Sequence, residues 1–139
     1  MTLPILLDTC AAIWVTDNDP RLKPAAVAEL TAAGQRGDPT YVSPITALEV
    51  ATLARKRRFT SNLSPRVWFE RLLQAPNLRL ADMSPNVLLE SQALPGGIHG
   101  DPADRIIAAT AREYGYRVMT RDSALLDYAE EGYLMAVAC

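Results

Sequence analysis

Short apolar runs alternate along the chain with longer segments whose apolar residues recur at helical spacing. The first run, residues 5–7, contains three apolar side chains and ends at Asp8. Uninterrupted runs of this kind are typical of strands that are buried on both faces of a sheet. Further runs predict strands over residues 41–43, 78–81, 116–120 and 133–137.

The longer segments predict seven helices, over residues 9–15, 25–33, 45–58, 65–74, 85–94, 102–114 and 123–130. Several begin with a capping residue followed by proline, which favours the first helical turn; the clearest is Asp101 before Pro102. Glycine is expected to end the second helix at Gly34, and the run Pro95-Gly96-Gly97 to follow the fifth.

Strands therefore alternate with helices from one end of the sequence to the other. This order implies right-handed crossovers, which build a central, mostly parallel sheet with helices on both faces. The sequence contains no internal repeat and no linker. We therefore expect residues 1–139 to form a single α/β domain, a three-layer sandwich.

Composition adds little beyond an ordinary folded chain. With 139 residues, the chain can bury a core without disulfides or a structural metal, so Cys10 and Cys139 are interpreted as free thiols in a reducing compartment. No apolar stretch approaches the roughly 18 residues of a membrane span, and the first apolar run lacks the features of a signal peptide. We expect a soluble, cytoplasmic protein.

Three carboxylates are expected at the carboxyl edge of the sheet, where open parallel sheets bind ligands. Asp8 directly follows the first strand, Asp122 lies two residues beyond the fourth, and Asp104 lies in the first turn of a helix. Each has a simpler explanation taken alone: Asp8 as a turn residue, Asp104 as a helix-dipole residue, and Asp122 as a helix cap.

Glu49 is a fourth candidate because helical periodicity predicts that it faces inward. It falls on the stripe formed by Ile45, Leu48, Thr52 and Leu53. A carboxylate on an inward stripe should be paired with a cation, protonated or bound to a metal. Pairing with Arg105 or Lys56 is the alternative to a metal.

Four carboxylates at one edge repel each other unless divalent cations neutralise them. Oxygen ligands favour Mg²⁺ or Mn²⁺ over zinc, and the single histidine, His99, excludes a zinc site with several histidines. The sequence also lacks G-x-S-x-G, P-loop and G-x-G-x-x-G motifs. We therefore expect His99 to shape a loop, and Asp101 to cap its helix.

Basic residues cluster in the run Arg55-Lys56-Arg57-Arg58. The run either compensates the dipole of its helix or contacts phosphate groups. A net charge of -2 argues at first against a nucleic-acid partner. If four acids belong to a metal site, however, the rest of the chain carries +2, which is compatible with RNA.

The chain resembles the VapC-type PIN-domain ribonucleases, the toxin halves of type II toxin-antitoxin pairs. The resemblance covers nearly the whole length and lies in four motifs: Leu6-Leu7-Asp8-Thr9 with Trp14; residues 43–51 around Glu49; residues 99–105 with the helix after them; and Thr120-Arg121-Asp122. Many relatives have histidine where this chain has Cys10, a departure that concerns local packing or substrate contacts and not the four acids.

The resemblance implies a PIN-like fold and an endoribonuclease that depends on Mg²⁺ or Mn²⁺ and cleaves RNA phosphodiester bonds with metal-activated water. Its acidic quartet would be Asp8, Glu49, Asp104 and Asp122, with Asp101 as a neighbour. A hydroxyl beside the metal would come from Thr9 or Thr120. The implied partners are a small antitoxin, which covers the acidic groove, and a second copy of the chain.

Two alternatives to the toxin remain open at this stage. One is a PIN-like scaffold that binds RNA or protein without cutting, although all four acids are present, and the other is a general RNA-processing nuclease. A receiver-type signalling domain would need paired acids after its first strand and a late lysine, and Asp8-Thr9 and Thr120-Arg121 offer neither. The segment with Trp68-Phe69 and Leu72-Leu73 is either core, which we favour, or part of a partner groove.

Overall fold

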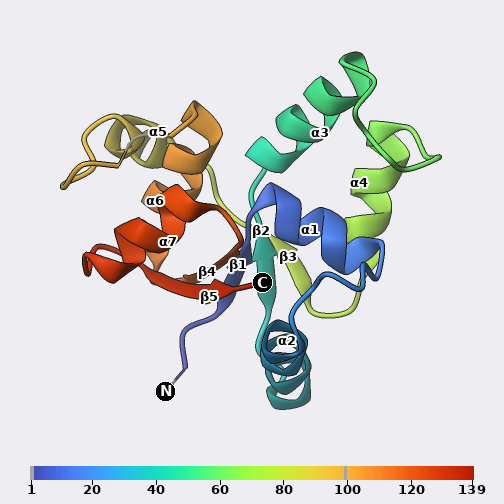
Figure 1. The fold of residues 1–139 in the computed structure, drawn as a ribbon, viewed down its shortest axis with the longest axis horizontal. Helices are drawn as coiled ribbons and strands as arrows, with labels where there is room; N and C mark the ends of the chain where they lie inside the picture. Colours follow the sequence, from blue (N-terminus) through green and yellow to red (C-terminus); the bar gives the residue numbers. More distant parts are fainter. Residues whose placement is uncertain (1, 99) are drawn as a thin grey trace.

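A five-stranded sheet forms the middle layer of the computed structural model, which describes residues 2–98 and 100–139 (Figure 1). The strands are β1 (Ile5–Leu7), β2 (Thr40–Val42), β3 (Leu78–Leu80), β4 (Arg117–Thr120) and β5 (Met135–Ala138). They lie in the order β3-β2-β1-β4-β5, and every neighbouring pair is parallel. The predicted α/β architecture is confirmed.

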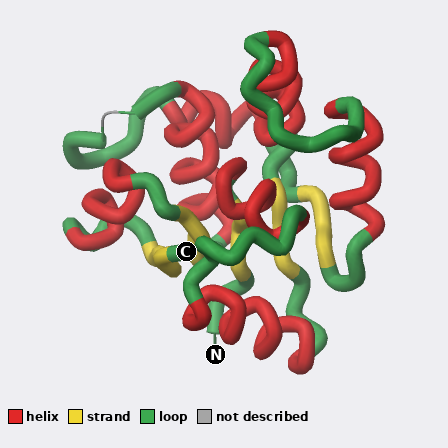
Figure 2. The backbone as a smooth tube through the Cα atoms, turned by 45° about the vertical axis from the view of Figure 1, so that its right-hand side comes forward, coloured by secondary structure: helices red, strands yellow, loops and turns green. Residues whose placement is uncertain are grey.

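The helices cover both faces of this sheet. They are α1 (Thr9–Thr16), α2 (Pro24–Arg36), α3 (Ile45–Arg55), α4 (Pro65–Gln74), α5 (Pro85–Ser91), α6 (Pro102–Tyr114) and α7 (Ser123–Glu130). Helices α5, α6 and α7 lie on one side and α1, α2 and α4 on the other (Figure 1). In the rotated view, the strands lie between these helices (Figure 2).

Alternation along the strands divides the core in two. Leu6 and Val118 point towards the face covered by α5, α6 and α7, whereas Ile5, Leu7 and Met119 point towards the opposite face. All five side chains are fully buried. Because both faces are covered, the strands are apolar at successive positions, which explains the uninterrupted runs in the sequence.

Trp68 and Leu72 of α4 belong to the second core layer, with 1% and 4% of their surface exposed. Phe69 and Leu73 are partly buried against the same layer. The prediction that this segment is core is confirmed. Within the described residues, no helix is both long and apolar enough to cross a membrane.

Helices α2 and α3 end at residues other than the predicted ones because of their C-terminal turns. Helix α2 continues through Gly34 to Arg36 and stops at Gly37, whose φ of 77° is accessible to glycine without strain. Helix α3 ends at Arg55 instead of residue 58, because Arg57 takes a positive φ and the Arg58 N–H returns to the Leu53 carbonyl at 2.8 Å. The basic run therefore lies largely in a turn.

Helix α5 stops at Ser91, short of the predicted residue 94. The Ser91 hydroxyl donates to the Leu88 carbonyl at 2.6 Å, and the Gln92 N–H bonds the Leu89 carbonyl instead. Pro95 has no N–H for the Ser91 carbonyl, which accepts from the Arg105 Nε at 2.8 Å. The last strand spans Met135–Ala138, whereas the sequence predicted residues 133–137. It begins at Met135 because its pairing with β4 begins there, opposite Arg117. Strand β1 has the predicted bounds, and those of β2, β3 and β4 differ from the prediction by at most one residue.

Arg117 ties three elements together at the beginning of β4. Its Nε donates to the Leu3 carbonyl at 2.9 Å, and its Nη1 donates to the Glu29 carboxylate of α2 at 2.9 Å. The arginine is 9% exposed, so its charge is largely removed from water. A buried charge needs such partners, which makes the pair a fixed link between α2 and the sheet.

We therefore predict that Glu29→Gln lowers the free energy of unfolding by about 1 kcal/mol, because Arg117 loses its countercharge. The matched control is Glu130→Gln, an exposed carboxylate of α7, which should change the value by less than about 0.5 kcal/mol. Urea denaturation monitored by circular dichroism measures both. Equal effects would contradict a specific role of the Arg117–Glu29 pair.

Candidate active site

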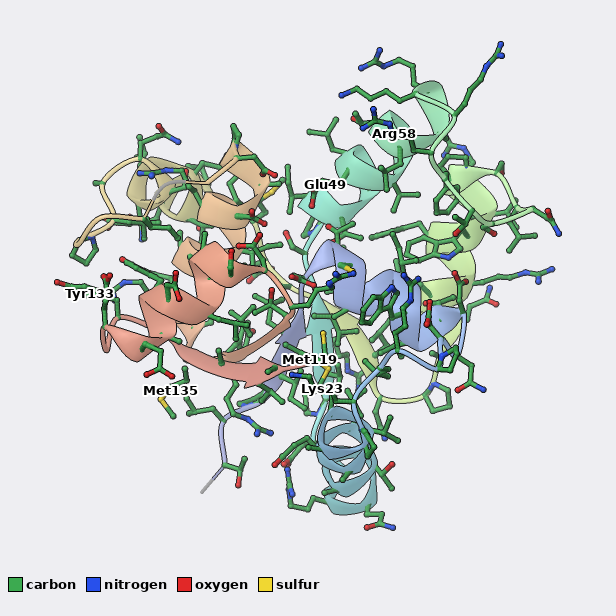
Figure 3. The ribbon with its side chains drawn as sticks, viewed as in Figure 1. Lys23, Glu49, Arg58, Met119, Tyr133 and Met135 are labelled. Atoms are coloured by element: carbon green, nitrogen blue, oxygen red, sulfur yellow. The ribbon has the colours of Figure 1, made fainter. Side chains whose placement is uncertain are left out.

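A cleft of about 620 Å³ opens at the carboxyl edge of the sheet, beside the ends of β1 and β4. Its acidic lining residues are Asp8, Asp17, Asp19, Glu49, Asp101, Asp104 and Asp122, and its basic ones are Arg21, Arg58 and Arg121. The four acids predicted from the sequence therefore line one cleft. Glu49 and Arg58 lie on the α3 side of it (Figure 3).

Asp8 is the most buried of these acids, with 4% of its surface exposed. Its Oδ1 accepts from the Ala11 N–H at 2.8 Å and so caps α1, and its Oδ2 accepts from the Thr120 hydroxyl at 2.5 Å. Burial raises the pKa of Asp8, and the two hydrogen bonds oppose that rise. The carboxylate is thus fixed at both oxygens.

Thr120 connects Asp8 to Asp122. Besides donating to Asp8, its hydroxyl accepts from the Asp122 N–H at 2.9 Å. The Asp122 carboxylate in turn accepts from the Leu125 N–H at 3.0 Å and caps α7. One buried hydroxyl therefore links the residue after β1 to the residue that caps α7.

Glu49 is half-buried, and its carboxylate accepts a hydrogen bond from the Thr9 hydroxyl. The predicted stripe is wrong at Leu48, which is 62% exposed; α3 instead buries Ile45, Thr46 and Val50. This rotation leaves Glu49 at the border of the buried face. Burial is the main cause of its raised pKa.

The alternative that Glu49 pairs with Arg105 or Lys56 is not what the structure shows. Arg105 donates to the backbone carbonyls of Ser91 and Ile98, each at 2.8 Å. The ion pairs formed within residues 2–98 and 100–139 do not include Glu49. Its charge therefore has no cationic side chain to offset it in the described structure.

The pKa of Asp104 lies far above the ordinary value of an aspartate. Burial and the surrounding carboxylates, those of Asp101, Asp122, Glu49 and Asp8, raise the pKa of Asp104 to about 7. Asp101 itself caps α6, as predicted: its Oδ1 accepts from the N–H groups of Ala103 and Asp104 at 2.8 and 3.1 Å.

The lining as a whole is strongly negative, with seven carboxylates against three guanidinium groups. In the described residues no three aspartate, glutamate, histidine or cysteine side chains are grouped closely enough to form a ready-made metal site. The carboxylate oxygens and the excess negative charge nevertheless fit a hard divalent cation in chemical terms. Residues that would hold such an ion are already in one cleft.

Cys10 also lines the cleft and is partly buried. Burial, followed by the negative charge of Asp8, raises the pKa of its thiol, and the nearby Arg121 acts in the opposite direction. The thiol is therefore protonated near neutral pH. Cys139 is a second free thiol, and burial raises its pKa to about 12.

One rim of the cleft was not predicted. Asp17, Asp19 and Arg21 come from the segment between α1 and α2, and Phe59 and Thr60 from the segment after α3. In sequence, these residues are indistinguishable from ordinary surface loops, so no local signal identifies them. The loop role predicted for His99 lies outside the described residues.

The chain matches a known protein family over most of its length. The PIN domain family matches residues 5–131. Over 121 residues the chain is 36% identical to Ribonuclease VapC22 of Mycobacterium tuberculosis, an alignment that covers 87% of this chain and 88% of that protein. The chain belongs to the VapC-type PIN-domain ribonucleases. The resemblance noted in the sequence is thereby confirmed.

Solved structures share the PIN-like fold. VapBC2 from Rickettsia felis, bound to a promoter DNA fragment, matches with a TM-score of 0.69 at 16% identity and covers 98% of both chains. DNA-bound VapBC from Salmonella typhimurium matches with a TM-score of 0.63 at 20% identity, over 99% of this chain and 98% of the other. A toxin-antitoxin complex from Klebsiella pneumoniae matches with a TM-score of 0.60 at 23% identity, over 96% of this chain and 95% of the other.

The shifted pKa of Asp104 predicts a pH dependence of stability in metal-free protein. The pKa of Asp104 is about 7 in the folded protein and ordinarily 3.8. Between these two pH values, the folded protein holds a proton that the unfolded chain has released. The free energy of unfolding should therefore fall as pH rises through this window. Urea denaturation in EDTA at about pH 5 and about pH 7.5 measures the change.

Asp104→Asn should remove part of this fall, because the amide has no proton to lose. Glu113→Gln, an exposed carboxylate on the same helix, is the control and should retain the wild-type profile. Superimposable pH profiles for wild type and Asp104→Asn would refute the assignment of the shift to Asp104.

Proposed function

We propose that this VapC-type ribonuclease is a divalent-metal-dependent endoribonuclease that acts as the toxin of a toxin-antitoxin pair. The observation that carries the proposal is the placement of Asp8, Glu49, Asp104 and Asp122 in one cleft at the carboxyl edge of the sheet. The pKa of about 7 for Asp104 supports it, because burial and then four neighbouring carboxylates disfavour the charged form, as expected of a group placed to receive a cation.

We assign Asp8 and Asp104 as the residues that would hold Mg²⁺ or Mn²⁺. Glu49 and Asp122 would bind the same ion or a second one. A divalent cation bound there would lower the pKa of water and offset negative charge on the phosphate. The protein's own part is to hold the carboxylates in position. Thr120 and the Ala11 N–H do this for Asp8 by donating to its two oxygens.

In the proposed reaction, water attacks phosphorus in line, a new P–O bond forms, and the bond from phosphorus to the 3′ oxygen breaks. The leaving oxygen takes up a proton, so the products carry 5′-phosphate and 3′-hydroxyl ends. The 2′-hydroxyl takes no part in these steps. Selection of RNA must then come from its shape, its unstacked bases and contacts with its phosphates.

The proposed partners are a small antitoxin and a second copy of this chain. The similar structure from Klebsiella pneumoniae is a toxin-antitoxin complex, and those from Rickettsia felis and Salmonella typhimurium are DNA-bound VapBC complexes, which supports the first partner. A cleft lined by seven carboxylates suits an antitoxin segment that inserts an arginine, because a guanidinium pairs with carboxylates through two parallel hydrogen bonds. Such a segment would also block the substrate.

We predict that the purified protein cleaves a pool of structured RNAs with Mg²⁺ or Mn²⁺, and that EDTA abolishes the cleavage. Asp8→Asn and Asp104→Asn should each lower the rate by at least about 100-fold, since each removes a charged ligand. Gel analysis of labelled RNA measures the rates, and mass spectrometry identifies the ends. Glu113→Gln is the matched control and should keep the wild-type rate, as it lies outside the cleft.

Ends with 2′,3′-cyclic phosphate would refute the mechanism, because they require attack by the 2′-hydroxyl. Absence of cleavage by wild type with either metal would favour the alternative, a PIN-like scaffold that binds without cutting. Loss of activity in Glu113→Gln equal to that in Asp104→Asn would show that the losses do not arise in the cleft.

A second prediction concerns inhibition by the antitoxin. A peptide from the C-terminal segment of the cognate antitoxin, in excess, should stop cleavage, and replacing its arginine with methionine should weaken inhibition by about tenfold or more. Titration of the peptide against the cleavage rate measures this. Equal inhibition by both peptides would contradict insertion of an arginine among the carboxylates.

A further inference from the structure

Trp14 of α1 lies in the wall of the cleft and organises two arginines of its rim. The guanidinium carbon of Arg121 lies 4.7 Å from the centre of the Trp14 ring, and that of Arg21 lies 4.8 Å from it. The indole is only 7% exposed. Both distances are within the range of cation–π contacts, so the ring restrains both side chains.

The two arginines differ in their anionic partners. Arg21 donates from Nη2 to Asp19 at 2.8 Å and from Nε to the same carboxylate, and this pairing lowers the pKa of Asp19 to about 2. Arg121 forms none of the ion pairs found within residues 2–98 and 100–139. Of the two guanidinium groups that contact Trp14, that of Arg21 is therefore paired with a carboxylate, and that of Arg121 forms no ion pair within the described residues.

Arg121 also stands at a chemically significant position. It is the residue between Thr120 and Asp122, both of which belong to the hydrogen-bond network that fixes Asp8. Its side chain is exposed at the cleft while its guanidinium group rests on Trp14. A cation held there sits beside the predicted cleavage site.

A polyanion that enters this cleft meets a lining with an excess of carboxylates, so cations at the rim are needed to attract it. Guanidinium is suited to this role because its planar N–H groups match phosphate oxygens in pairs. Stacking on an aromatic ring leaves those N–H groups free at the edge of the plane, and it reduces the side-chain entropy lost on binding.

We propose that Arg121, positioned by Trp14, binds a backbone phosphate of the RNA strand beside the phosphate that is cleaved. Phosphate contacts set register and orientation without reading sequence. Arg121 would thus place the strand in the cleft whatever its bases. The inference rests on the proposed function, because it takes RNA as the ligand.

The test measures binding separately from cleavage. All variants carry Asp104→Asn to prevent turnover, and fluorescence anisotropy follows a labelled single-stranded oligoribonucleotide with Mg²⁺ present over a series of salt concentrations. Arg121→Met and Arg121→Lys are compared with Arg79→Met, which removes the same charge from an exposed position on β3 outside the cleft. Circular dichroism and thermal unfolding confirm that each variant is folded.

Arg121→Met should weaken binding by about tenfold for oligonucleotides of different sequence. The plot of log affinity against log salt should become less steep by about 0.7, the value for one phosphate contact to a single strand. Arg121→Lys should keep the wild-type slope and lose part of the affinity. Lysine retains the charge but lacks the planar guanidinium group that stacks on Trp14. Arg79→Met should leave both quantities near wild type.

Equal affinity and salt slope for Arg121→Met and Arg79→Met would overturn the inference while leaving the proposed nuclease untouched. Weaker antitoxin binding in Arg121→Met with unchanged RNA binding would also overturn it, since the residue would then serve the protein partner. If the Asp104→Asn chain binds no RNA at any salt concentration and the wild type cleaves none, the proposed function itself fails. The two failures are therefore distinguishable.

Discussion

Repulsion between carboxylates is the physical constraint on this cleft, because the fold brings several of them together. Asp8, Glu49, Asp101, Asp104 and Asp122 all line it, and in water such groups would separate. The sheet prevents this because β1 and β4 are adjacent although they are far apart in sequence. The chain adds strands to one side of β1 first and to the other side later, and open sheets bind ligands where that order reverses.

Helix beginnings offset part of this repulsion. Asp8, Asp101 and Asp122 cap α1, α6 and α7, so the positive ends of three helices lie among the carboxylates. The capping explanation and the catalytic explanation of these acids are therefore compatible. A cap fixes the carboxylate, and a fixed carboxylate needs little rearrangement to receive a cation. Asp104 caps nothing, and it is the acid whose pKa reaches about 7.

The sequence predicted correctly those features of the fold that depend on a few neighbouring residues. The apolar run before Asp8, the Asp101-Pro102 helix start and the position of Asp122 after β4 each predict their place in the fold from a few neighbouring residues. The rotation of α3 was predicted wrongly because it depends on what Ile45 and Val50 pack against, not on periodicity alone. The stacking of Arg121 on Trp14 joins residues over a hundred positions apart, and no local pattern encodes it.

The hydrogen bond between Thr120 and Asp8 spans 112 positions of the sequence. During synthesis, β1 leaves the ribosome more than a hundred residues before its neighbour β4, so the parallel pairing of the two strands waits for β4 to emerge. A nascent chain that has emerged as far as α6 holds Asp8, Glu49 and Asp104 but has neither Thr120 nor Asp122 to complete the cleft. The order of the strands thus delays assembly of the site until β4 and the start of α7 have been synthesised.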